Sequence, residues 1–261
     1  MAHAGEVHDE GVVIEKNLKL LCNDNYSLGY QVAMMVDRDL ARVGGGKLSA
    51  HKTGGILGET LQKAFRLLDR PINYLEIGSQ FGGSAVVAGL LNKGGEIVCI
   101  DPMETLEDHK VYGMVNTGHR GHTGVRPIFE WNMEHYGVSN RVTLIEELSV
   151  PFPELPEGFV PDVTYVDGDH SEEFAYADVT AVAPITTHFI VMDDYIHWSG
   201  VRPAVKRFLR DNDRWDLVYA DYAIAVLADV EKTGKEGADL NFITGVSQVT
   251  AYQSRTPQPD A

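Results

Sequence analysis

The sequence predicts an α/β domain with a doubly wound, mostly parallel sheet of seven strands and an N-terminal helical cap. Short apolar runs alternate with segments of helical periodicity, which is the pattern of a parallel sheet covered by helices. Several apolar runs end in glycine or in a carboxylate, as strands do where a ligand binds beyond their carboxyl ends. The chain of 261 residues is long enough to bury the core of one such domain.

The first 70 residues are predicted to precede the sheet. Residues 1–12 are acidic and contain histidine, and we expect them to be disordered. Apolar residues recur at helical spacing over residues 17–43 and from about residue 55 to residue 68, with Gly44-Gly45-Gly46 between the two segments. We therefore expect residues 13–70 to form a helical cap over the ligand side of the sheet.

Seven later runs are predicted to be strands. They are Tyr74–Ile77, Ile97–Ile100, Arg141–Ile145, Val163–Val166, Phe189–Met192, Trp215–Tyr219 and Tyr222–Leu227. Helices are expected after the first strand and at Phe129–Tyr136, Glu172–Val182 and Val201–Leu209. The last two strands would form a hairpin around Ala220-Asp221, which makes one strand antiparallel, and residues 229–261 form a charged, less regular C-terminal extension.

Residues 103–127 are predicted to be a lid or substrate loop. The segment holds His109, His119 and His122 together with several glycines. Long glycine-rich loops inside compact domains commonly bind ligands. We expect these histidines to be polar loop residues rather than metal ligands.

Composition restricts the class of partner. The 38 acidic and 22 basic residues give a net charge of −16, which repels phosphate backbones, so no nucleic-acid partner is expected. No apolar run approaches the length of a membrane span, and residues 1–10 lack the pattern of a signal peptide. Cys22 and Cys99 form no disulfide framework, which predicts a reduced, cytoplasmic setting.

The segment from Tyr74 to Asp101 is the predicted ligand-binding turn. Glu76-x-Gly78-x-x-x-Gly82 follows the first strand, and its glycines allow the backbone to approach a ligand. Dinucleotide sites usually carry three glycines here, whereas the acid in this chain repels a pyrophosphate and suits a ligand with an amino group. Asp101 ends the second strand, where a carboxylate can bond ribose hydroxyls.

Acidic residues end or follow four of the predicted strands. They are Glu76, Asp101, the pair Asp167 and Asp169, and the pair Asp193 and Asp194. Because parallel strands end at one edge of the sheet, these acids are expected to gather in one crevice. So many like charges are costly without a cation, and oxygen ligands favour Mg²⁺ or a similar divalent ion.

Two later motifs carry a specific resemblance. Asp162-Val-Thr-Tyr-Val-Asp167-Gly-Asp-His170-Ser and Ile190-Val-Met-Asp193-Asp194-Tyr195 resemble the metal-dependent small-molecule O-methyltransferases. Glu76-x-Gly78-x-x-x-Gly82 resembles motif I of the class I S-adenosylmethionine-dependent methyltransferases. Gly200-Val-Arg-Pro-Ala-Val-Lys-Arg-Phe is similar to the branch that includes macrocin-type sugar O-methyltransferases of antibiotic pathways. The resemblance covers residues 53–228 and implies the Rossmann-like methyltransferase fold.

The resemblance implies roles for individual residues. S-adenosylmethionine would contact Glu76, Gly78, Ser79, Gly82, Ser84, Asp101, Ser149 and Asp167, with Ser149 near the adenine. Mg²⁺ or a similar cation would be held by Asp167, Asp193 and Asp194. His170 takes the place of a lysine base in catechol-type relatives, and Asp169 and His197 compete for that role. The implied reaction is Mg-dependent O-methylation of a small molecule such as a sugar, a phenol or a natural product.

Two departures and several alternatives stay open. Thr186-Thr187-His188 stands where relatives often have Pro-Gly-Gly, and the loop 103–127 has no counterpart that identifies the acceptor. The same branch resembles cephalosporin-hydroxylase-like proteins, and Asp167-Gly-Asp169 also fits a metal-dependent nucleotide-sugar glycosyltransferase. A protein that only senses the cofactor is a third alternative. The helical cap and the apolar residues 242–249 suggest a homo-oligomer.

Overall fold

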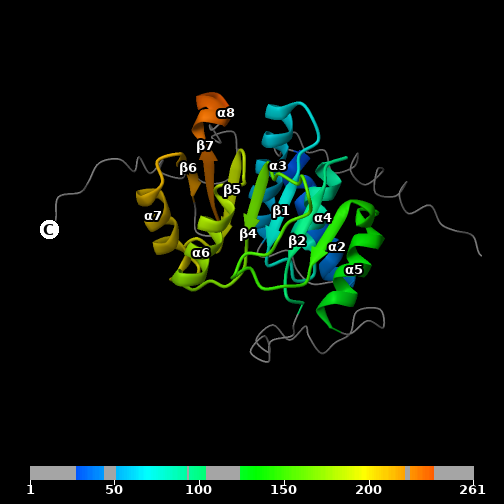
Figure 1. The fold of residues 1–261 in the computed structure, drawn as a ribbon. Coiled ribbons are helices and arrows are strands. Elements are labelled where there is room, and N and C mark those ends of the chain that lie inside the picture. Colours follow the sequence, from blue (N-terminus) through cyan, green and yellow to red (C-terminus); the bar gives the residue numbers. More distant parts are fainter. Residues whose placement is uncertain (1–27, 44–50, 93, 104–123, 221–223, 238–261) are drawn as a thin grey trace, which may run out of the picture.

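The computed structural model describes residues 28–43, 51–92, 94–103, 124–220 and 224–237. They form a seven-stranded sheet with helices on both faces (Figure 1). The strand order is β3-β2-β1-β4-β5-β7-β6. The predicted α/β fold class, a doubly wound and mostly parallel seven-stranded sheet, is therefore confirmed.

The element bounds follow the chain in order. The strands are β1 (Tyr74–Ile77), β2 (Ile97–Ile100), β3 (Val142–Ile145), β4 (Val163–Val166), β5 (Phe189–Asp193), β6 (Trp215–Ala220) and β7 (Ile224–Asp229). The helices are α2 (Leu28–Val43), α3 (His51–Leu68), α4 (Gly83–Leu91), α5 (Val125–His135), the 3₁₀ helix η2 (Ser139–Arg141), α6 (Glu172–Val182), α7 (Val201–Asp211) and α8 (Val230–Gly237). No described helix is long and apolar enough to cross a membrane.

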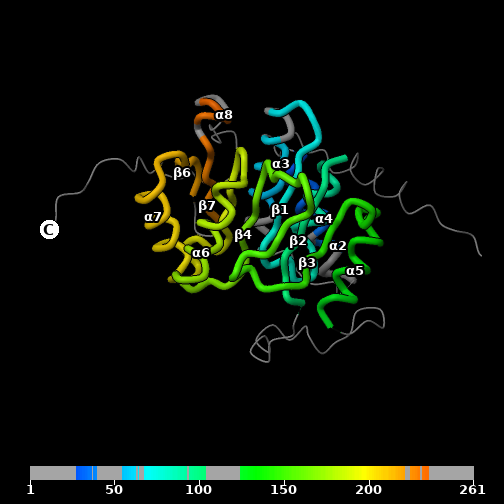
Figure 2. Tube along the Cα trace, in the orientation of Figure 1, coloured from blue at the N-terminus to red at the C-terminus, as the bar shows by residue number. Residues whose placement is uncertain are grey.

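Strand direction fixes where a ligand can bind. Strands β1 to β5 pair in parallel, while β7 is antiparallel to both β5 and β6. The chain moves outward from β1 to β2 and β3, and then returns to β4 and moves the other way (Figure 2). In such sheets the strand order reverses beside β1, and ligands bind outside the carboxyl ends of the strands at that point. We call this side of the sheet the carboxyl edge.

Both faces of the sheet are covered, which explains the apolar strands. In β1 the side chains of Tyr74 and Glu76 face the core formed with α2, α3, α4 and α5. Leu75 and Ile77 face the opposite core, formed with α6 and α7. All four residues are buried, as is usual for a parallel strand between two layers of helices. An acid on such a strand is therefore placed inside the protein.

Helices α2 and α3 pack against each other through two glycines. A Cβ atom on Gly29 of α2 would overlap the backbone of Gly58 on α3, and the reverse holds for Gly58. The pair joins the core through Val36 and Leu61, on the face that α4 and α5 also cover. Both helices expected in this region are present, and α3 begins at His51, earlier than predicted. The division of the chain at residues 12, 70 and 228 stays a prediction.

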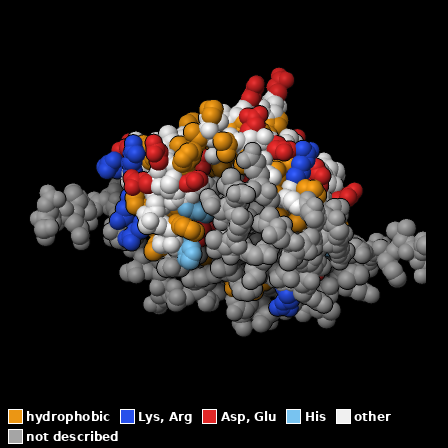
Figure 3. Space-filling model, turned by 90° about the horizontal axis from the view of Figure 1, so that it is seen from below, with side chains coloured by type: hydrophobic (Ala, Val, Ile, Leu, Met, Phe, Trp, Pro, Cys, Tyr) orange, Lys and Arg blue, Asp and Glu red, His pale blue; other side chains and the backbone are white. Residues whose placement is uncertain are grey.

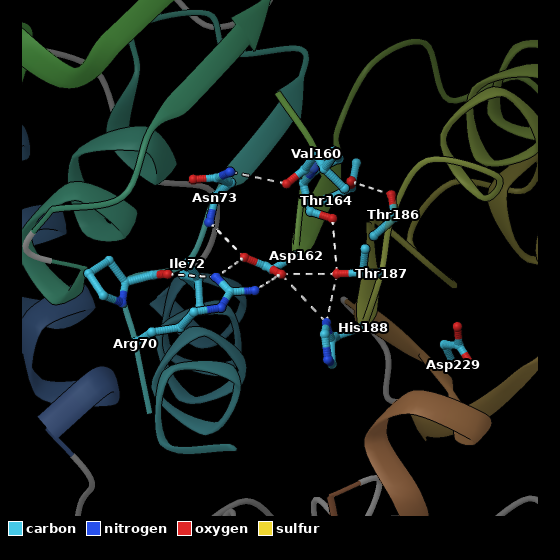
Figure 4. Close-up of polar contacts among 12 residues, drawn as sticks. Arg70, Ile72, Asn73, Val160, Asp162, Thr164, Thr186, Thr187, His188 and Asp229 are labelled. Carbon is cyan, nitrogen blue, oxygen red and sulfur yellow. Dashed lines mark hydrogen bonds and ion pairs between the residues drawn. The ribbon is translucent and has the colours of Figure 1, made fainter. Parts of the chain in front are cut away.

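A polar network joins three strands at the opposite, amino edge (Figure 4). Asp162 precedes β4 and accepts hydrogen bonds from both terminal nitrogens of Arg70, at 2.9 and 2.8 Å. Its carboxylate also accepts from the N–H of Asn73 at 2.9 Å and from the hydroxyl of Thr187 at 3.0 Å. Burial opposes ionisation, but these donors and the charge of Arg70 hold the pKa of Asp162 below its ordinary value.

The turn before β5 carries Thr186-Thr187-His188. Thr186 is buried, and its hydroxyl lies 2.6 Å from that of Thr164 and donates to the carbonyl of Val182 at 2.8 Å. The N–H of Thr187 donates to the carbonyl of Pro161 at 2.9 Å. Side-chain and backbone hydrogen bonds therefore shape this turn.

Three element predictions were wrong in detail. Helix α5 begins at Val125, before the predicted Phe129, because Pro127 lies in the first turn, where a missing N–H costs no helical hydrogen bond. Strand β7 (Ile224–Asp229) ends two residues after the predicted Leu227, and the predicted start at Tyr222 lies outside the described residues. Helix α8 follows Asp229, whose carboxylate accepts from two N–H groups of the first turn and so caps a segment predicted to be irregular.

Some predictions lie outside the described residues. They concern residues 1–27, including Cys22, the histidines at positions 109, 119 and 122, residues 221–223 of the hairpin, and residues 242–249.

Candidate functional site

The glycine turn (residues 78–82) connects β1 to α4 at the carboxyl edge. Gly78 has φ +82°, and a Cβ atom there would collide with the carbonyl oxygen of Asp167. Its N–H donates to the carbonyl of Ile100 at 2.9 Å. The turn therefore lies tight against the ends of β2 and β4, and only glycine fits both the space and the backbone conformation.

The end of the turn begins α4. Gly82 has φ +77°, and a Cβ atom there would overlap Phe129 and Met133 of α5. No side chain caps the helix, and its first turn contains no acid. The first N–H groups of α4 are thus available for a ligand anion. Ser84, which was predicted to contact the cofactor, lies in this first turn and is half-buried.

Asp101 fixes two turns at once. Its Oδ2 accepts from the N–H of Gln80 at 2.8 Å, and its Oδ1 accepts from the N–H of Met103 at 2.7 Å. Gln80 and Met103 both have positive φ, at 45° and 55°. The carboxylate stays half-exposed, so its remaining lone pairs can accept from a ligand hydroxyl.

Glu76 lies on β1 just before the turn and is completely buried. The hydroxyl of Tyr74 donates to its Oε2 at 2.6 Å. Burial raises its pKa to about 7, although the hydroxyls of Ser79 and Ser84 lie close enough to offset part of this rise. Its Oε1 has no hydrogen-bond partner among the described residues, and the same is true of the buried Ser79 Oγ. Glu76 Oε1 on β1 and Ser79 Oγ in the glycine turn are thus two buried polar atoms to which a ligand could hydrogen-bond.

The acids of β4 and β5 meet at the same edge, which Figure 3 shows face-on with acidic and histidine side chains close together. The Nε2 of His170 lies 3.1 Å from Asp194 Oδ2 and 3.4 Å from Asp167 Oδ1. One donor atom from each of the three residues lies within 4.8 Å of the others. We call Asp167, His170 and Asp194 the His–Asp cluster. Its side chains are half-buried and remain accessible.

Negative charge accumulates around this cluster. Burial is the largest cause that raises the pKa of Asp167 well above its ordinary value, and the charges of Asp194 and Glu76 add to it. The pKa of Asp193 is raised by burial and then by the charges of Asp167 and Asp194. Asp194 also has φ +54°, a conformation that side chains rarely adopt and that often marks functional sites. A bound cation would relieve this repulsion.

Asp193 lies beside Asp167 and differs from the cluster in its burial. Its side chain is 1% exposed, and Oδ2 accepts from the hydroxyl of Tyr165 at 2.8 Å. The group of donor atoms that could hold an ion contains His170 instead. The sequence predicted Asp167, Asp193 and Asp194 as ligands, and two of these three are in that group.

The other predicted residues lie nearby with different surroundings. Asp169 is exposed, and its Oδ1 accepts from the N–H of Ser171 at 2.8 Å, so it shapes the turn before α6. His197 is exposed on the loop after β5, edge-on to Trp198. Ser149 is half-buried after β3, close enough to lower in part the pKa of Asp178, which burial raises to about 6.

Four residues of the site escaped the sequence analysis or received no role there. Tyr74 and Tyr165 hold the two buried acids, and strand periodicity could have revealed the pair Tyr74 and Glu76, because residues two apart share a face. Trp198 stacks on His170 with ring centroids 5.3 Å apart. Asp178, a buried acid of α6, was assigned no role from the sequence.

Comparison with known proteins agrees with this geometry. Residues 75–195 match the family model described as "Methyltransferase domain". The match contains the glycine turn and all three residues of the His–Asp cluster. Residues 75–195 therefore form a methyltransferase domain, and the chain has the Rossmann-like methyltransferase fold.

Two solved structures share the fold. One is a candidate O-methyltransferase from Klebsiella pneumoniae, 17% identical, covering 84% of this chain and 96% of its own, with a TM-score of 0.54. The other is a candidate caffeoyl-CoA O-methyltransferase from Staphylococcus aureus, 15% identical, covering 84% of this chain and 99% of its own, with a TM-score of 0.55. No curated protein matches the chain.

Proposed function

We propose that the protein transfers the methyl group of S-adenosylmethionine to a hydroxyl oxygen of a small molecule, with the help of a divalent cation. One observation carries the proposal: the stretch that matches a methyltransferase domain contains both a glycine turn fitted to a close ligand and an acidic cluster beside it. Both solved structures compared above are described as O-methyltransferases, which supports oxygen as the methyl acceptor.

The glycine turn fits the amino-acid end of the cofactor. Glu76 Oε1 and Ser79 Oγ are buried without partners, and a ligand ammonium group would satisfy the first of them. Gly78 and Gly82 allow close approach, and the uncapped start of α4 near Ser84 favours a carboxylate. These contacts would orient the cofactor so that its methyl group points away from the turn.

The nucleoside end of the cofactor has its own candidate contacts. Asp101 is half-exposed at the end of β2, where it can accept from ribose hydroxyls while it fixes Gln80 and Met103. Ser149 follows β3 and is proposed to lie near the adenine. Asp167 ends β4 between the two halves of the site and contributes to both.

The acidic residues fit a divalent cation. Asp167 and Asp194 offer accessible oxygens, and the buried Asp193 lies beside them and accepts a hydrogen bond from Tyr165. A cation bound here would lower the pKa of the acceptor hydroxyl and orient its oxygen. The chain also has to hold the acceptor in line with the methyl group and to accept its proton. We propose His170, Asp169 and His197 as the side chains that compete for this last role.

Methyl transfer from labelled S-adenosylmethionine to a panel of sugars and phenols tests the reaction. We expect label on a hydroxyl oxygen, loss of activity in EDTA, and recovery with added divalent cation. Asp194→Ala should reproduce the effect of EDTA, whereas Asp211→Ala, an exposed acid at the end of α7, should not. Full activity of the wild type in EDTA together with full activity of Asp194→Ala would exclude the metal role.

Calorimetry separates the proposal from its alternatives. S-adenosylhomocysteine should bind without metal, because the glycine turn is proposed to hold it independently of the cluster. Binding of a nucleotide sugar instead would favour the glycosyltransferase reading of Asp167-Gly-Asp169 and contradict the proposal.

A further inference from the structure

We infer that His170, one of the three side chains proposed above as the catalytic base, is instead a ligand of the divalent cation. Its nitrogen would make the site prefer Mn²⁺ or a similar transition metal over Mg²⁺. The inference deepens the proposed function, because it rests on a cation at the carboxyl edge. It can still be tested without any methyl acceptor, since it concerns the donor atoms of the site.

The distances within the His–Asp cluster match those between neighbouring ligands of one ion. Ligand bonds of about 2.1 Å place adjacent donors about 3.0 Å apart in an octahedron and about 3.4 Å apart in a tetrahedron. Nε2 of His170 lies 3.1 Å from Asp194 Oδ2 and 3.4 Å from Asp167 Oδ1. A single ion can therefore reach all three donors with little movement of the chain.

Accessibility favours His170 over Asp193 as the third donor. The side chains of Asp167, His170 and Asp194 are between 22% and 28% exposed, so an ion and an acceptor can reach them. Asp193 is 1% exposed and its Oδ2 already accepts from Tyr165. The imidazole thus lies on the open side of the cluster, whereas Asp193 lies on the closed side.

The surroundings of His170 fix its ring in the orientation that a ligand needs. Trp198 stacks on it with ring planes 7° apart. A Cβ atom on Gly200 would overlap the carbonyl of His170, so the loop after β5 packs directly against this backbone. Metal-bound histidines are commonly held by such neighbouring groups, which set the direction of the nitrogen lone pair.

The donor set decides which ion binds. Mg²⁺ prefers oxygen ligands and keeps several waters, whereas imidazole nitrogen favours transition metals. Two carboxylates and one imidazole therefore favour Mn²⁺, Fe²⁺, Co²⁺ or Zn²⁺. Because Nε2 would be occupied by the ion, the proton of the acceptor would go to Asp169 or His197 instead.

The test compares metal binding to the purified full chain and to three variants, without cofactor or acceptor. His170→Gln removes the nitrogen, His170→Asp replaces it with oxygen, and His135→Gln is the matched control. His135 also stacks on a tryptophan, Trp131, and its Nε2 lies 3.7 Å from Asp39, but no second carboxylate completes a cluster in the described chain. Calorimetric titrations with MnCl₂ and with MgCl₂ give the affinities, and pulsed EPR of the Mn²⁺-loaded protein reports directly bonded nitrogen.

We expect His170→Gln to weaken Mn²⁺ binding at least about tenfold and to abolish the nitrogen coupling, with a smaller effect on Mg²⁺. His170→Asp should shift the preference toward Mg²⁺, a change that a merely structural histidine would not produce. His135→Gln should match the wild type. Mn²⁺ affinity and nitrogen coupling that survive in His170→Gln would overturn the inference. If the wild type shows nitrogen coupling but no methyl transfer, the inference stands while the proposed function falls.

Discussion

The hydroxyl of Tyr165 donates a hydrogen bond to Oδ2 of Asp193 across 2.8 Å, from β4 to β5. Both side chains are buried at the carboxyl edge of the sheet. Burial and the charges of Asp167 and Asp194 raise the pKa of Asp193, and the tyrosine hydroxyl opposes that rise. Asp193, the last residue of β5, is thus held in the interior, while Asp194 belongs to the accessible His–Asp cluster.

Tyr165→Phe should destabilise the protein by about 1–3 kcal/mol, because it removes a donor from a buried carboxylate. The raised pKa of Asp193 sets the pH dependence. Its protonated form is favoured in the folded state, so the cost of the missing donor should grow as the pH rises through the raised folded-state pKa of Asp193. Urea unfolding across a series of pH values measures the effect. Tyr176→Phe is the control, since its hydroxyl meets Asp211 at an exposed site, and an equal loss in both variants would contradict the argument.

Glu76→Gln should flatten the pH dependence of stability between pH 4.5 and pH 7. The folded-state pKa of Glu76 is about 7 against an ordinary value of 4.5, so in this window the folded protein holds a proton that the unfolded chain has lost. The free energy of unfolding of the wild type should therefore fall by up to about 3 kcal/mol as the pH rises through it. Urea unfolding across this range measures the difference, and exposed Glu96→Gln should keep the wild-type slope.

The same variant tests the contact with the cofactor. Affinity for S-adenosylhomocysteine should fall by about tenfold or more in Glu76→Gln, because a charge-assisted hydrogen bond becomes a neutral one. Unchanged affinity at pH 8 would show that the buried carboxylate does not meet the ligand.

Gly78→Ala should destabilise the protein and abolish cofactor binding, because it adds two separate costs. A side chain at φ +82° costs about 1–2 kcal/mol, and its Cβ would also displace the carbonyl of Asp167. Gly158→Ala isolates the first cost, since Gly158 has φ +77° and nothing within 4 Å of the added atom. Thermal unfolding and S-adenosylhomocysteine titrations of both variants give the comparison. Equal losses in the two would mean that the close approach to Asp167 is unimportant.

The fold could be predicted because the buried strands are simple in sequence. A strand covered on both faces, such as Ile97–Ile100, is a short apolar run that ends at a turn or an acid. Helix boundaries were harder to predict. Pro127 was read as the end of a loop although it lies within the first turn of α5, and the capping role of Asp229 was not recognised.

The site could be predicted only as far as strand direction determines it. Parallel strands bring Glu76, Asp167 and Asp194 to one edge, whatever the details of the turns. The separation of Asp193 from Asp194 depends on a single residue with φ +54°, and no sequence pattern fixes that conformation. The inclusion of His170 in the cluster depends on how the loop after β5 packs, through Trp198, against the loop after β4.

Asp162→Asn should destabilise the protein by about 2–4 kcal/mol, because it leaves Arg70 and the N–H of Asn73 without their charged acceptor at the amino edge. The pKa of Asp162 is depressed, so its stabilising contribution is complete above the ordinary value of 3.8 and is lost as the pH falls through the folded-state value. The difference between wild type and variant in urea unfolding should therefore be large at pH 7 and small near pH 2. Arg126→Met, which breaks a fully exposed pair with Glu130, is the control and should leave the unfolding midpoint unchanged. Asp162 joins β1, β4 and β5 at the end of the sheet opposite the site. The folded Asp162→Asn variant should therefore bind metal with the affinity of the wild type. A loss of metal binding in the folded variant would show that the amino edge positions the cluster.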